Sequence, residues 1–287
     1  MVVGIAWLWS HHGDWSAKEG EEMSYIWKEW LELSRGKAFW LFFLLVVAAS
    51  LSVLMSAKSL PAEHGLTIFL QMMFDMNAYI VSLLCLFFAS FSVMQEKEQR
   101  TMVMIVAKSG SPWQFLWKKS AAIQLITMMM FVVWYFVLII PAKFWFVFHL
   151  SYFLYFLLAT VVLVFIFNQI GIGLGFACKT KIQLIGANLF AAFFFIYLYD
   201  FVLLYILPSV TYDNVHVFSL VYFLQPLHAL RFYLETSLGM FSLDYLSRTM
   251  KKFFSFPPGA LVALNMFVWG LGALVASMVW SRKGEER

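Results

Sequence analysis

Residues 152–170 read YFLYFLLATVVLVFIFNQI, a run without a single charged side chain. An α-helix rises about 1.5 Å per residue, so about 20 apolar residues cross the hydrocarbon core of a bilayer. The whole chain of 287 residues is 62% hydrophobic and only 13% charged, whereas soluble domains carry about 25% charged residues. Further long apolar runs occupy residues 38–57, 78–94, 120–140 and 184–207. The sequence therefore predicts an integral membrane protein and leaves no room for a soluble domain.

The apolar runs predict an all-α polytopic membrane protein with short connections between its transmembrane helices. We expect six spans, at about 38–57, 67–94, 115–140, 150–177, 183–207 and 259–280. Proline or charged residues separate them; Pro141, for example, is expected to end the third span. Gly171 and Gly175 lie four residues apart in the fourth span, a spacing that permits a second helix to approach closely.

An amphipathic helix is expected before the first span, over residues 24–35. The apolar side chains of Trp27 and Trp30 recur there at helical spacing, and Glu29 and Arg35 are among the charged residues between them. This helix is too polar to span, so it should lie in the plane of the membrane interface.

The segment 208–258 is too long for a plain loop. Its apolar stretches at 217–224 and 227–234 predict short interfacial or re-entrant helices before the last span. The expected organisation is a poorly ordered leader over 1–23, one transmembrane domain over 24–283 and a short cytoplasmic tail over 284–287.

Lysine and arginine gather on one side of the predicted bundle, and such residues are enriched on the cytoplasmic side of membrane proteins. That side holds Lys28, Arg35, Lys37, Lys97, Arg100, Lys108, Lys118, Lys119, Lys179, Lys181, Arg282, Lys283 and Arg287. The opposite side holds Lys58, Lys143, Arg231, Arg248, Lys251 and Lys252. We therefore expect a multi-pass protein of the plasma membrane with both termini in the cytoplasm.

The sequence lacks the motifs of several enzyme classes. No stretch has the spacing of a phosphate-binding Walker motif, and neither Gly-x-Ser-x-Gly nor His-Glu-x-x-His occurs. Cys85 and Cys178 fit neither a disulfide framework nor a zinc site. We therefore expect no cofactor, no metal and no ATP hydrolysis by this chain.

Four polar side chains inside the predicted spans are functional candidates, because polar groups are costly in hydrocarbon. Asp75 and Asp200 lie near the outer ends of their spans, and either could serve an intramembrane enzyme or simply bind a neighbouring helix. Asn168 and Gln169 lie deeper, where they need partners, and neighbouring helices are the expected source.

The most informative polar stretch follows the second span. It begins at Glu96 with Glu-Lys-Glu-Gln-Arg-Thr and is followed by a short apolar segment, by Ser111-Pro112 and by Lys118-Lys119. A compact amphipathic element in a cytoplasmic loop can dock in a groove on a partner protein. The alternative is a solvated loop that only supplies positive charge.

Taken in order, these features resemble the permease subunits of type-2 ABC exporters. That family carries an acid-x-acid-x-x-Thr pattern after the second span, then a proline-containing turn and a lysine before the third span. The matching residues here are Glu96, Glu98, Thr101, Pro112 and Lys118 or Lys119, and Arg100 stands where the family usually has glycine. The 27–35 stretch, with Trp27, Glu29, Trp30 and Arg35, looks like the interfacial elbow helix of these permeases.

The resemblance implies an ABC-2 type transmembrane domain over residues 24–283 of a bacterial permease. It further implies that two such subunits pair as a homodimer in the bilayer, and that a separate ATPase subunit docks on about 96–112. No nucleic acid partner is implied.

A narrower resemblance involves two stretches farther along the chain. Asp200-Phe-Val-Leu-Leu and Gln225-Pro-Leu-His-Ala-Leu-Arg231 look like motifs of permeases tied to maturation of nitrous oxide reductase. Gln225 replaces the asparagine of that pattern, and its acid near the arginine is missing. This resemblance implies a role in assembling a copper site outside the cytoplasm, and it leaves open an assembly factor that moves no substrate.

Overall fold

The computed structural model describes residues 36–61, 64–99, 112–241 and 248–277, together with Trp27, Trp30 and Leu31. Over these residues all regular structure is helical, with no strand, which confirms the predicted fold class. Six helical segments within the described residues are long and apolar enough to cross a membrane: Trp40–Ala57, Gly65–Glu98, Leu116–Ala142, Leu150–Ala177, Lys181–Ser209 and Pro258–Ser277. The chain is thus a multi-pass membrane protein.

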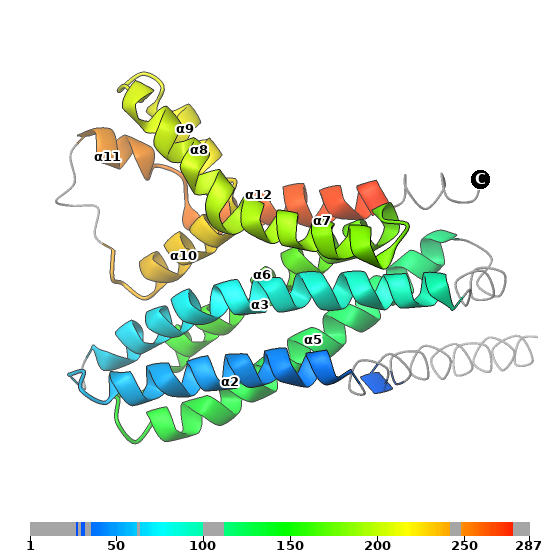
Figure 1. The fold of residues 1–287 in the computed structure, drawn as a ribbon. Helices are drawn as coiled ribbons and strands as arrows, with labels where there is room; N and C mark the ends of the chain where they lie inside the picture. The colour runs from blue at the N-terminus through cyan, green and yellow to red at the C-terminus, as the bar shows by residue number, and fades with distance from the viewer. Residues whose placement is uncertain are drawn as a thin grey trace, which may run out of the picture.

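Each of the first four spans is a single helix, and all four run lengthwise through the molecule (Figure 1). They are α2 (Lys37–Ala57), α3 (Gly65–Glu98), α5 (Pro112–Ala142) and α6 (Leu150–Ala177). The third span does not end before Pro141 as predicted, because α5 continues to Ala142. Pro141 has no backbone N–H to bond the Val137 carbonyl, and this loss is confined to the last turn of α5.

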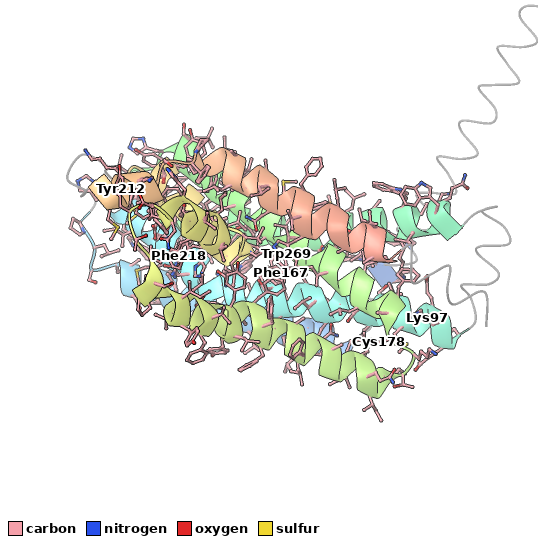
Figure 2. All side chains as sticks on the ribbon, turned by 90° about the horizontal axis from the view of Figure 1, so that it is seen from above. Lys97, Phe167, Cys178, Tyr212, Phe218 and Trp269 are labelled. Carbon is pink, nitrogen blue, oxygen red and sulfur yellow. The ribbon has the colours of Figure 1, made fainter. Side chains whose placement is uncertain are left out.

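The last two spans are helices interrupted by π-helical turns. The fifth consists of α7 (Lys181–Phe193), η1 (Phe194–Leu198) and α8 (Tyr199–Ile206), which the 3-10 turn η2 (Leu207–Ser209) follows. The sixth begins with α12 (Pro258–Asn265) and η3 (Met266–Leu271). Both π-helical turns meet near mid-span, where the rings of Phe195 and Trp269 lie 4.9 Å apart and Phe167 packs on Phe195 (Figure 2).

The segment between the last two spans forms short helices, as predicted. They are α9 (Val215–Phe223), α10 (Pro226–Ser237) and α11 (Arg248–Phe253). We call α9 and α10 the hairpin and name the end of the molecule that carries them the hairpin end. The opposite end, where α3 finishes, is the Glu96 end.

Little of the predicted elbow helix lies in the described part of the chain. Trp27, Trp30 and Leu31 are helical, with Trp27 exposed and Trp30 half-buried. Glu29 and Arg35 lie outside the described residues, as do the whole of the predicted 1–23 leader and the 284–287 tail.

The central helix is α3, which is 34 residues long and packs on α2, α6, α7 and α10. Glycines on α6 allow its closest contact. A Cβ added to Gly171 would lie 2.7 Å from the Leu86 carbonyl oxygen, and one added to Gly175 would lie 2.9 Å from that of Ser90. Both contacts are with α3 backbone, which cannot move aside without shifting the helix, so the predicted glycine packing is confirmed.

Gly171→Leu is therefore expected to separate α3 from α6 and to lower the midpoint of thermal unfolding in detergent by several degrees. Gly186→Leu is the matched control, because no atom lies within 4 Å of a Cβ built at this α7 glycine. A loss of stability in the control equal to that of Gly171→Leu would show that the α3–α6 contact is not the cause.

Candidate functional site

Three consecutive residues near the last turn of α3 each reach a different neighbouring helix at the Glu96 end. Glu96 lies 3.2 Å from the ammonium of Lys119 on α5, and the two side chains are only 1% and 0% exposed. Removing charges from water is costly, and the attraction between the two charges offsets part of that cost. Breaking it from one side leaves a buried charge, so the pair fixes α3 against α5.

Lys97 binds the end of α6. Its ammonium donates hydrogen bonds to the backbone carbonyls of Gly175 at 2.8 Å, Phe176 at 2.7 Å and Cys178 at 3.2 Å (Figure 2). The last carbonyls of a helix have no partners within the helix and carry partial negative charge, which a cation stabilises. Lys97 thus caps α6 from a neighbouring helix.

Glu98 makes the third connection, to α7. Its carboxylate lies 2.6 Å from the ammonium of Lys181, with both side chains about half exposed, at 44% and 56%. An exposed pair of this kind contributes about 0–1 kcal/mol. Together, residues 96–98 connect α3 to α5, α6 and α7; we call this set of contacts the inner tie.

The residues predicted to meet a partner protein differ in how accessible they are. Glu96 lies inside the bundle, whereas Glu98 is accessible. Pro112 is the first residue of α5, and Arg100 and Thr101 lie outside the described residues. The sequence did not indicate that Glu96 and Lys119 would meet, because the two residues belong to different predicted helices.

Asn168 and Gln169 face α5 in the same half of the molecule. The Asn168 amide donates to Thr127 Oγ1 at 2.7 Å and to Gln124 Oε1 at 3.1 Å. The Gln169 amide donates to Ser120 Oγ at 2.7 Å. These contacts join the fourth span to the third through groups that hydrocarbon could not solvate.

A second ionic cluster lies at the hairpin end, on the polar face of α10. Arg231 Nε and Nη2 both lie 2.7 Å from Asp75 Oδ1 on α3. Gln71, one turn before Asp75, donates to that same oxygen at 3.3 Å and to Glu235 Oε1 at 3.4 Å. His228 Nε2 lies 2.8 Å from Asp200 Oδ1 on α8. We call these contacts the outer tie.

The outer tie brings together both intramembrane acids that the sequence singles out. His228, Arg231 and Glu235 lie at positions i, i+3 and i+7, which share one face of a helix. Asp75 and Asp200 line one cleft with His228 and Arg231, and its volume of about 20 Å³ suits a water molecule rather than a larger substrate.

The protonation of the α10 groups follows from their burial. Burial lowers the pKa of His228, against the opposing effect of its hydrogen bond with Asp200. Burial also raises the pKa of Glu235, against the opposing charge of Arg231. Neutral His228 then donates from Nε2 to Asp200, and Tyr222 stacks on its ring at 4.3 Å.

The turn between α9 and α10 is bound to the two π-helical spans. Asn265 donates to the Phe223 carbonyl at 2.7 Å, and the Trp269 indole donates to the Leu224 carbonyl at 2.7 Å. The Gln225 amide donates to the Phe195 carbonyl within η1. The sequence analysis missed Asn265 and Trp269; an asparagine inside the last apolar span was the signal that could have found the contact.

Within the described residues, no three His, Cys, Asp or Glu side chains are placed to hold a metal ion. The ionic groups instead pair helix with helix at both ends of the bundle.

The sequence matches no protein-family model and no characterised protein. The resemblance to type-2 ABC permeases therefore stays a prediction.

Lys119→Met should destabilise the protein by about 3–5 kcal/mol, because it leaves the Glu96 carboxylate buried without this cation. Adding Glu96→Gln to this variant should restore most of the lost stability, as measured by thermal unfolding in detergent. Lys181→Met is the control and should cost at most about 1 kcal/mol, since it removes an exposed pair. Equal losses in Lys119→Met and Lys181→Met would contradict the buried ion pair.

Acid should loosen the hairpin through His228. Its pKa is lower in the folded protein than in the unfolded chain, so its contribution to stability is complete above about pH 6.5 and decreases as the pH falls below that value. Amide hydrogen exchange in α10, corrected for the intrinsic rate, should rise between pH 7.5 and 5.5. His228→Gln should remove that dependence; an unchanged dependence would assign it to another group.

Proposed function

We propose that this chain is the membrane-spanning permease subunit of an ABC exporter, driven by a separate ATPase subunit at the Glu96 end. The observation that carries the proposal is the inner tie, in which adjacent residues of one helix hold three other spans. A partner that moved the end of α3 would move α5, α6 and α7 with it. The segment joining α3 to α5 is the one whose motifs resemble the ATPase-docking region of the family.

In this proposal the contacts of the outer tie change at the hairpin end during an alternating-access cycle. Arg231 connects α10 to α3, and His228 connects α10 to α8. Packed interfaces of this type have discrete arrangements rather than continuous ones, so a partner can bias one against another. In this proposal ATP binding at the Glu96 end shifts α3, and the contacts of α10 with Asp75 and Asp200 are exchanged as the hairpin end opens.

A second copy of the chain completes the transporter in this proposal. The fifth span is the least covered by the rest of the chain, with 17% of its most apolar window buried, against 67% for α3. A helix that packs so little within one subunit has its surface available for lipid or for another subunit. The proposed complex is a permease homodimer in the plasma membrane with two ATPase subunits on the cytoplasmic side.

A second candidate is a membrane assembly factor that moves no substrate, such as one that supports maturation of a copper enzyme outside the cytoplasm. It is favoured by the contact of His228 and Arg231 with two acids, because the narrower resemblance rests on the same stretches. An intramembrane enzyme is less well supported. Asp75 and Asp200 each already bind a cationic or imidazole side chain of α10, which suits a helix contact better than a free acid or base.

Affinity purification of the tagged chain from native membranes tests the permease proposal. We expect an ATPase with a Walker motif to copurify, with Glu98→Lys greatly reducing the amount recovered. The charge-swapped Glu98→Lys, Lys181→Glu double variant separates two causes. Recovery of the ATPase would place the effect in the α3–α7 pair, and continued loss would place Glu98 in the docking surface.

Recovery of the ATPase at the wild-type level with Glu98→Lys would remove Glu98 from the docking surface. Absence of any ATPase from the wild-type preparation would contradict the permease proposal itself and favour the assembly factor.

A further inference from the structure

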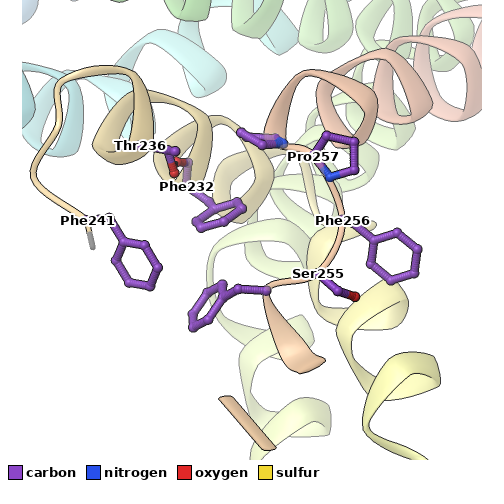
Figure 3. A pocket seen from close by; sticks show the side chains of 8 residues that line it. Phe232, Thr236, Phe241, Ser255, Phe256 and Pro257 are labelled. Carbon is purple, nitrogen blue, oxygen red and sulfur yellow. Dashed lines mark hydrogen bonds between the residues drawn. The ribbon is translucent and has the colours of Figure 1, made fainter. Parts of the chain in front are cut away.

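A pocket of about 440 Å³ opens at the hairpin end, between α10 and the segment that joins α11 to α12. Its walls are mainly phenylalanine rings and two prolines; the rings belong to Phe232, Phe241, Phe254 and Phe256 (Figure 3). Phe254 organises the wall, since its ring lies 5.1 Å from that of Phe232 and 4.6 Å from that of Phe241. Pockets of this size and character are typical of sites for apolar ligands.

The two hydroxyl groups in the wall are already engaged. Thr236 donates to the Phe232 carbonyl at 2.8 Å, and the Ser255 hydroxyl lies 3.4 Å from His216 Nδ1. Among the described residues that line the pocket, none is acidic or basic. The part of a ligand that enters the pocket is therefore apolar, because a polar group would lose its hydration there without finding a partner.

A cation adjoins this apolar wall. Lys251 precedes Phe254 by three residues, and the Phe254 amide still bonds the Met250 carbonyl in helical fashion, so both side chains belong to one helix face. The Lys251 side chain is exposed. Its neighbour Lys252 differs, since its ammonium binds the Tyr212 carbonyl at 2.7 Å and lies over the Tyr212 ring.

The pocket also lies at the right depth for a lipid. Pro257 and Pro258 line it, and Pro258 begins the last span. The apolar wall therefore lies beside the first turn of that candidate span, with the exposed Lys251 one helical turn before Phe254. An anionic lipid combines a long apolar chain with an anionic headgroup, and these two parts match the apolar wall and the nearby lysine.

We propose that this pocket binds one acyl chain of an anionic phospholipid from the surrounding leaflet, with the lipid phosphate beside Lys251. A dry cavity of about 150 Å³ holds a benzene ring, so a pocket of about 440 Å³ has room for a substantial length of chain. The lipid would join α10 to the segment between α11 and α12. This site does not depend on ATP-driven transport, so it stands or falls separately from the proposed function.

Thermal unfolding of the purified full chain in a neutral detergent tests the site. The probes are dioctanoyl phosphatidylglycerol, which is anionic, and dioctanoyl phosphatidylcholine, which is not. A ligand that binds only the folded protein raises the midpoint, and we expect phosphatidylglycerol to raise it by about 2–4 °C more than phosphatidylcholine does. Equal shifts with the two lipids would overturn the role of the anionic headgroup.

Three variants locate the effect. Thr236→Trp fills the pocket while leaving its phenylalanine rings in place and should abolish the phosphatidylglycerol shift. Ser255→Trp is the substitute if that variant does not fold. Lys251→Gln should reduce the phosphatidylglycerol shift to the phosphatidylcholine value. Lys143→Gln removes an exposed cation between α5 and α6 and should leave the shift intact. Persistence of the full shift in the pocket-filling variant that folds would overturn the proposal.

Discussion

The arrangement of the bundle depends on one buried ion pair, between Glu96 of α3 and Lys119 of α5. A buried charge is costly unless it is paired with an opposite charge. The packing of the bundle must therefore bring α3 into contact with α5. Successive helical residues point about 100° apart, so Lys97 and Glu98 are then directed toward other neighbours. They reach the end of α6 and the start of α7. A single turn of α3 thereby contacts three other spans.

The same helix carries the contact that fixes the other end. Asp75 lies on α3 as well, and its pairing with Arg231 holds α10 against the bundle, while His228 extends the contact to Asp200. Asn265 and Trp269 of the last span donate hydrogen bonds to the turn of the hairpin. Because α3 is one uninterrupted helix from Gly65 to Glu98, a displacement at its Glu96 end is transmitted to Asp75 along a rigid element. This continuity is the physical basis for treating the two ties as coupled.

Much of this architecture could be predicted from the sequence. Hydropathy alone placed the spans and the short helices of the hairpin, since length and apolar character are local properties. The identity of the important polar residues was also predictable, because Asp75, Asp200 and Glu96 are conspicuous near or within apolar runs. Their partners were not, since a pairing such as Asp75 with Arg231 joins residues that are far apart in the chain.

Two further features had no local signal. The π-helical turns η1 and η3 lie in uniformly apolar stretches, where hydrogen-bond register has no effect on hydropathy. Both turns coincide with tertiary contacts, since the turn of the hairpin binds the Phe195 carbonyl in η1 and the Trp269 indole in η3. Glu96 was expected at a docking surface because its neighbours are charged, and only the position of Lys119 on α5 shows that its side chain is internal.

The central claim of the permease proposal is that the spans joined by the inner tie move as one body when the proposed ATPase subunits bind ATP. Double electron–electron resonance measures this motion directly. It is done on the proposed complex of permease and ATPase subunits, reconstituted with Cys85 and Cys178 replaced. Spin labels at Gln99 and at Ile182, both exposed, report the distance between the ends of α3 and α7. The account predicts that this distance stays the same on ATP binding while the distance between the Ile182 labels of the two copies changes. A change in the Gln99–Ile182 distance as large as that between the copies would contradict it.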